Sequence, residues 1–125
     1  MTIKEAIALC DELRPNHYSE EVKIRWLSKL DGRIYRELLL THADCSVNHF
    51  SGYDASTQGD TLLLVPAPYD EDVYNYFLQA QIDKENGETT RYNQSITMYN
   101  AAFRAYANAY HSDHMPVSHG RRFLF

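Results

Sequence analysis

Residues 69–111, YDEDVYNYFLQAQIDKENGETTRYNQSITMYNAAFRAYANAYH, decide the fold class, because two helical patterns follow each other in this stretch with only a short break between them. In the first half the apolar residues cover more than one side of a helix; they are Val73, Tyr74, Tyr76, Phe77, Leu78, Ala80 and Ile82. Asn86-Gly87 predicts the end of this helix, since glycine readily adopts the left-handed conformation of a C-cap. We expect the helix to be the central element of the fold.

In the second half, aromatic and aliphatic residues recur at steps of four and three, at Tyr92, Ile96, Tyr99, Phe103, Tyr106 and Tyr110. This spacing predicts an amphipathic helix that forms an αα-hairpin with the one before it. Two interpretations of the tyrosine seam (Tyr92, Tyr99, Tyr106 and Tyr110) stay open. The seam either completes the domain's own core or contacts a neighbouring subunit, because tyrosine buries a large area while keeping a polar tip.

Two further helices are expected before this hairpin. Thr2 and Glu5 have the spacing of a capping box, and an apolar stripe follows at Ile3, Ala6, Ile7, Cys10 and Leu13. Pro15 and Asn16 end that helix, and Ser19 is the expected N-cap of the next one. In this second helix, of about twenty residues, apolar residues recur every fourth position at Val22, Trp26, Leu30, Ile34 and Leu38, with Leu27 beside them.

The charges of the second helix alternate in sign along its sequence. Basic residues stand at Lys23, Arg25, Lys29, Arg33 and Arg36, and acidic residues between and around them at Glu20, Glu21, Asp31 and Glu37. A nucleic-acid-binding surface normally presents a continuous basic stripe. We therefore interpret this pattern as the solvated face of the helix.

Residues 43–65 and the C-terminus are less regular. Residues 43–60 read as a long loop, and Val47–Tyr53 with Leu62–Val65 are candidates for a small β-hairpin within 43–65. From Ser112 onward the helical pattern stops. The sequence thus predicts a mainly α fold, a compact bundle of about four helices over residues 1–111, followed by a flexible C-terminal tail over 112–125.

Length and composition are those of a single soluble domain. The chain has 125 residues, 44% of them hydrophobic and 23% charged, with a net charge of −5. No apolar run approaches the ~20 residues that span a membrane, and Thr2–Glu5 does not begin a secretory signal. Cys10 and Cys45 stand far apart, which favours one reduced core cysteine and one loop cysteine.

No group of residues predicts catalysis or a cofactor. His111, Ser112, Asp113 and His114, with His119 nearby, match no closed zinc pattern and are more simply a solvated helix end. Asp70, Glu71 and Asp72 suit the positive end of a helix dipole better than acid–base chemistry. The five glycines are scattered and form no phosphate-binding loop. We expect a protein that is not an enzyme and binds neither metal nor cofactor.

The last five residues are Arg121, Arg122, Phe123, Leu124 and Phe125. Terminal segments are usually frayed and inert. Three large apolar groups at a chain end are, however, costly to leave in water, so capture by a groove or sheet edge of a partner is the alternative interpretation.

Two strings, LRPNHYSEEVKIRWLSKLDGRI (13–34) and LLVPAPYDEDVYNYFLQAQIDKENGETTRYNQSITMYNAAFRAYANAYH (63–111), resemble small proteins of phages and prophages of Gram-positive bacteria. These proteins are grouped with the head–tail connector (adaptor) proteins of long-tailed phages. The resemblance covers roughly residues 5–115 and rests on packing motifs, not on chemistry.

The resemblance implies a virion structural protein that forms a ring of about a dozen copies below the portal. It implies as partners the portal protein and the next connector or tail protein, with a subunit that is compatible with a monomer in isolation. DNA would pass through the ring without specific binding, and no membrane is involved. The protein would be present in the host cytoplasm during assembly and then at the head–tail junction of the virion. In this family C-terminal segments reach into the portal, which would make residues 121–125 an anchor.

Ring formation requires two different faces on each subunit, and the charged second helix and the tyrosine-bearing fourth helix are the expected pair. An acidic subunit also repels the phosphates of passing DNA. Two alternatives stay open: a head-completion or tail-terminator component of the same assembly, and a small nucleic-acid-binding packaging or regulatory protein.

Overall fold

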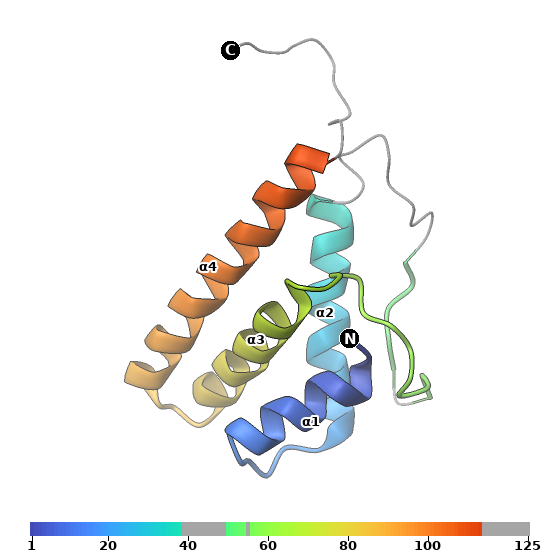
Figure 1. Cartoon of the computed structure of the whole chain (residues 1–125). Helices are drawn as coiled ribbons and strands as arrows, with labels where there is room; N and C mark the ends of the chain where they lie inside the picture. The colour runs from blue at the N-terminus through green and yellow to red at the C-terminus, as the bar shows by residue number, and fades with distance from the viewer. Residues whose placement is uncertain (39–49, 55, 114–125) are drawn as a thin grey trace.

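Helix α3 (Asp70–Glu85) lies at the centre of the fold and contacts α1 (Ile3–Leu13), α2 (Glu20–Glu37) and α4 (Thr89–Asp113). The computed structural model describes residues 1–38, 50–54 and 56–113 of the chain. In Figure 1, α3 and α4 run side by side, and α1 and α2 lie on the other side of α3. These described residues contain four helices and no strand, so the predicted mainly α bundle is confirmed.

Helix α1 begins with the predicted capping box. The Thr2 hydroxyl accepts a hydrogen bond from the Glu5 N–H at 3.1 Å, and the Glu5 carboxylate accepts one from the Thr2 N–H at 2.8 Å. The predicted apolar stripe is buried at Ile3, Ala6, Ile7 and Cys10. Leu13 is 56% exposed, so its assignment to the stripe is wrong; α1 ends there, and the next residue, Arg14, makes the contact with α3 instead.

Helix α2 begins after Ser19, whose hydroxyl accepts from the Val22 N–H at 3.2 Å as predicted. The buried apolar residues of α2 and its C-cap are Ile24, Leu27, Leu30, Ile34 and Leu38. Val22 and Trp26 are only half-buried, so the inward face is rotated from the predicted every-fourth series at the start of the helix.

Two charged residues that the sequence assigned to the solvated face of α2 lie inside. Lys23 is 3% exposed, and its ammonium contacts the Asp11 carboxylate of α1 at 2.5 Å. Asp31 is fully buried and accepts hydrogen bonds from groups outside α2. The prediction was wrong for both because each has polar partners on another segment, which offset the loss of water.

The predicted αα-hairpin of α3 and α4 is confirmed. Helix α3 is capped at Asn86, whose N–H donates to the Ile82 carbonyl at 2.9 Å, and Gly87 follows at φ +74° in the left-handed region. Helix α3 is buried on more than one side, as its apolar pattern indicated. The carboxylate of Asp83, fully buried in α3, accepts from the Arg14 guanidinium and from the Ser95 hydroxyl of α4 at 2.9 Å. One buried carboxylate therefore joins α3 to the end of α1 and to α4.

The predicted hairpin in 43–65 is not found in the described part of that segment. Leu62 instead forms an isolated antiparallel bridge with Thr2. The Leu63 N–H donates to the Met1 carbonyl at 3.0 Å, and the Ile3 N–H to the Thr61 carbonyl at 3.1 Å. Residues 39–49, which include Cys45 and the first three residues of the expected hairpin partner, lie outside the described residues.

Helix α4 continues to Asp113, past the predicted end of the helical domain at His111. The rest of the predicted tail, residues 114–125, lies outside the described residues. Cys10 is a free cysteine in the core, as expected, and burial raises the pKa of its thiol to about 12.

Replacing Thr2 by alanine removes the acceptor of the capping box. We expect Thr2→Ala to lower the free energy of unfolding by about 1 kcal/mol, measured by urea denaturation. Thr97→Ala is the matched control, because Thr97 is exposed within α4 and caps no helix. An unchanged stability of Thr2→Ala would show that the box contributes nothing to the fold.

Candidate functional site

The described residues hold no cluster of three or more His, Cys, Asp or Glu side chains that could bind a metal ion. Of the histidine group at the end of α4, His111 is exposed, whereas His114 and His119 lie outside the described residues. Over the same residues, none of the helices has the length and apolar character needed to cross a membrane.

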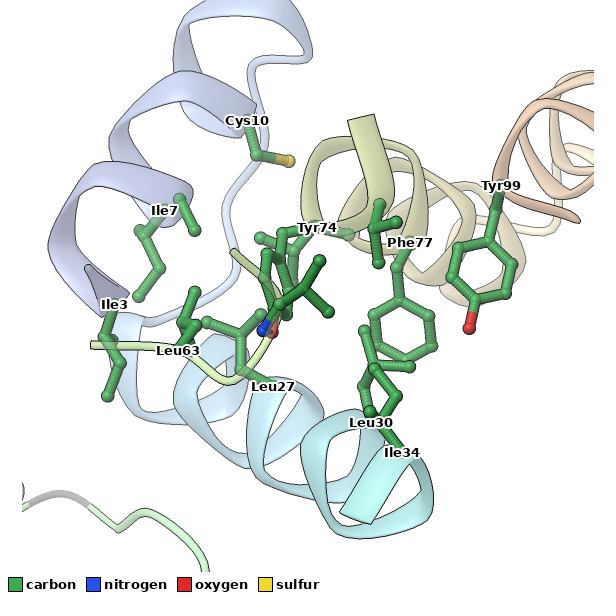
Figure 2. Packing of buried hydrophobic residues seen from close by; sticks show 14 of the residues in the cluster. Ile3, Ile7, Cys10, Leu27, Leu30, Ile34, Leu63, Tyr74, Phe77 and Tyr99 are labelled. Carbon is green, nitrogen blue, oxygen red and sulfur yellow. Dashed lines mark hydrogen bonds between the residues drawn. The ribbon is translucent and has the colours of Figure 1, made fainter. Parts of the chain in front are cut away.

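The tyrosine seam faces the chain's own core at its centre. Tyr99 is 7% and Tyr106 is 3% exposed, whereas Tyr92 and Tyr110 are half-buried. The Tyr99 ring lies 5.6 Å from that of Phe77, and the Tyr106 ring 5.9 Å from that of Tyr69. Figure 2 shows Tyr99 directed toward Phe77 and the Leu30–Ile34 side of α2.

Tyr99 and Tyr106 therefore have little surface left for a neighbouring subunit, and for these two residues the core interpretation holds. Tyr92 and Tyr110 keep part of their surface. The other expected interface residues, Arg121, Arg122, Phe123, Leu124 and Phe125, lie outside the described residues. The exposed surface of α4 therefore consists of residues other than Tyr99 and Tyr106.

That exposed surface of α4 carries almost no charge. Between Asn93 and Ser112 the only Asp, Glu, Lys or Arg is Arg104. Besides Arg104, which is itself exposed, the exposed residues from 93 to 108 are Met98 and side chains that are small or carry an amide or hydroxyl; the full set without Arg104 is Asn93, Gln94, Thr97, Met98, Asn100, Ala101, Ala105 and Asn108. Met98 is 47% exposed, and of the described helices only α3 packs against α4. We call these eight residues the uncharged face of α4.

On α2, the buried Asp31 fixes how the segment 50–65 lies against the helix. Its carboxylate accepts from the Tyr53 hydroxyl at 2.6 Å, the Tyr74 hydroxyl at 2.6 Å and the Leu64 N–H at 3.0 Å. The Tyr74 hydroxyl in turn accepts from the Val65 N–H at 2.9 Å. One side chain of α2 thus binds both ends of the segment and the central helix.

Burial determines the protonation behaviour of this network. The loss of water raises the pKa of Asp31 above its ordinary value, although its three hydrogen-bond donors act in the opposite direction. Burial, with the nearby Asp31 charge, also raises the pKa of Tyr74 and of Tyr53, so both hydroxyls stay protonated and donate.

One turn before Asp31, Ser28 of α2 holds Gly52 and Tyr53 close to the helix. Its hydroxyl accepts from the Tyr53 N–H at 2.9 Å. Gly52 has φ +94°, and a Cβ at that position would lie 2.8 Å from the Ser28 hydroxyl oxygen. Only glycine fits this backbone conformation at this distance without displacing Ser28.

Because residues 50–52 are held against α2, a groove of about 560 Å³ forms between them and the helix. Gly32, in the middle of α2, and the ring of Phe50 line it together with Tyr35. Its charged residues are Lys29, Arg33, Arg36 and Glu37. We call this the α2 groove.

The charges of the α2 groove are only partly neutralised. Arg33 lies 3.7 Å from the Glu37 carboxylate, a weak exposed pair. Lys29 and Arg36 are exposed and form no ion pair within the described part of the chain. The groove therefore has two cationic side chains available for a ligand or partner.

The sequence placed these basic residues on α2 correctly but missed the groove. A signal was present for Asp31, which stands four residues after Leu27 and three before Ile34, on the inward side of the helix. No pattern indicated that Ser28 and Asp31 would bind a segment more than twenty residues away, because that contact needs the folded chain.

Comparison with family models, with curated proteins and with solved structures gives no match to this chain.

Tyr74→Phe tests the Asp31 network. We expect it to lower the free energy of unfolding by about 1–3 kcal/mol, because the Val65 N–H loses its buried acceptor and Asp31 a donor. Tyr76→Phe on the same helix is the control, since Tyr76 is half-buried and its hydroxyl has no hydrogen bond within the described residues. Equal losses in both variants would contradict the assignment.

The raised pKa of Asp31 predicts a pH dependence with a defined sign. Between the ordinary Asp pKa and the raised value, the folded state binds more protons than the unfolded state, so stability falls as pH rises through this window. Asp31→Asn cannot titrate at this position. We expect the stability of the wild type minus that of Asp31→Asn to decrease from pH 3 upward and then to level off, as measured by urea denaturation. A difference that increases with pH would refute this.

Proposed function

We propose that this chain is a virion structural protein, a head–tail connector (adaptor) subunit that forms a ring below the portal and has no enzymatic activity. The resemblance of residues 13–34 and 63–111 to phage adaptor proteins supports this proposal. The chemistry of the two open surfaces described above supports it independently.

The observation that carries the proposal is the contrast between those surfaces. The α2 groove holds unpaired positive charges, whereas the uncharged face of α4 has amides, hydroxyls and alanines. Depletion of charge is typical of the central part of protein–protein interfaces. A subunit in a stack of rings needs different surfaces for its lateral neighbours and for the ring above or below.

The overall charge suits the passage of DNA. With a net charge of −5 per subunit, a ring of such chains repels phosphate and avoids the salt-dependent binding that a basic channel would show. The partners in this proposal are the portal protein and the next connector or tail protein, with residues 121–125 as the portal anchor. Assembly takes place in the host cytoplasm, and the subunit ends at the head–tail junction.

A nucleic-acid-binding protein is the second candidate function. Lys29, Arg33 and Arg36 of the α2 groove favour it, although Lys23 does not contribute because it is buried against Asp11. In an electrophoretic gel shift, such a protein would bind DNA with an affinity that falls with salt and that reversal of these charges abolishes.

Counting copies in purified, DNA-filled particles tests the proposal. We expect quantitative mass spectrometry to find about a dozen copies of this polypeptide per particle, measured against the major capsid protein. Absence from the particles would overturn the structural role and leave nucleic-acid binding as the function to pursue.

A further inference from the structure

The α2 groove contains cationic side chains without an ion-pair partner among the described residues, and a glycine in its lining. Lys29 and Arg36 make no ion pair within the described part of the chain, and Gly32 lies between them. Among the described residues, the nearest atom to a Cβ at Gly32 would be a carbon of the Phe50 ring at 3.8 Å, an ordinary contact, so their packing does not require glycine there. Glycine inside a helix costs stability relative to alanine. What Gly32 provides is space in the groove beside an aromatic ring.

A segment with complementary chemistry is exposed elsewhere on the same chain. Pro66, Ala67 and Pro68 are exposed and lead into the first turn of α3, where Glu71 and Asp72 are exposed as well. Neither carboxylate forms an ion pair among the described residues. The Pro66 carbonyl accepts from the Tyr69 and Asp70 N–H groups, so the prolines lie in a turn that loses little conformational freedom on binding and offers an apolar surface to a groove lined by Phe50 and Tyr35.

We propose that the α2 groove binds residues 66–72 of a second copy of this chain. Pro66 and Pro68 of one copy pack over Gly32 and Phe50 of its neighbour, and Glu71 and Asp72 pair with Lys29 and Arg36. Since the two surfaces consist of different residues, the contact is heterologous and repeats from copy to copy. The inference rests on the proposed function in one respect, because a ring needs a lateral contact of this kind.

Other occupants fit the groove less well. The C-terminal segment contains Arg121 and Arg122, which the basic groove repels. A DNA backbone carries one charge about every 1.7 Å and is repelled by a chain of net charge −5, while the groove offers few cations to release its counterions. An acidic turn with two carboxylates matches the groove's two unpaired cations.

A charge-swap experiment on the full chain tests the contact. The groove variant is Lys29→Glu with Arg36→Glu, and the turn variant is Glu71→Lys with Asp72→Lys. Arg25→Glu with Lys84→Glu is the matched control for the groove variant, because it reverses two positive charges in the same way at exposed sites outside both surfaces, one of them near an end of α3. Circular dichroism and thermal unfolding check that each variant folds.

Sedimentation equilibrium at low ionic strength is the measurement. We expect the wild type and the control to self-associate with rising concentration, and each test variant alone to do so ~10-fold more weakly or not at all. An equimolar mixture of the two test variants should associate again, since both reversed and original charge pairs then form.

Three outcomes would overturn the inference. The first is a mixture that fails to associate although both variants fold, and the second is a wild type that stays monomeric at every concentration. The third is binding of a fluorescent single-stranded oligonucleotide that the groove variant loses, which would assign the groove to nucleic acid. The number of copies in the particles does not depend on any of these measurements, so copy counting tests the proposed function separately.

Discussion

Asp31 is the group on which the arrangement of this molecule depends most. It lies fully buried in α2, forms no ion pair among the described residues, and is stabilised by hydrogen bonds from the hydroxyls of Tyr53 and Tyr74 and the Leu64 N–H. A buried carboxylate without such donors would be strongly destabilising. The need to satisfy it brings the segment 50–65 onto α2 and positions α3 in the same step.

A second buried carboxylate performs the same task on the other side of α3. Asp83 binds Arg14 at the end of α1 and Ser95 of α4. The apolar contacts around α3 supply the general driving force, but they are not directional. The two polar networks specify which segments meet, because their hydrogen bonds form in one arrangement only.

The packing of the core determines which side chains of α4 and α2 stay exposed, and these exposed surfaces bear on function. Tyr99 and Tyr106 are used in packing α4 on α3, so the exposed side of α4 is uncharged and made of small and amide side chains. Ser28 and Asp31 hold Gly52 and Tyr53 on α2, and this creates a groove beside Lys29 and Arg36. Both surfaces suit contacts between proteins.

The sequence by itself determined the helical class, the positions of the helices and most of the buried apolar residues. These follow from local rules, namely the capping box at Thr2, the cap at Ser19, the glycine after α3 and the helical spacing of apolar side chains. The burial of Lys23 and Asp31, the pairing of Leu62 with Thr2 and the α2 groove were decided only by the tertiary structure. Each depends on a partner far away in sequence, and periodicity along one helix does not show whether such a partner will compensate a buried charge.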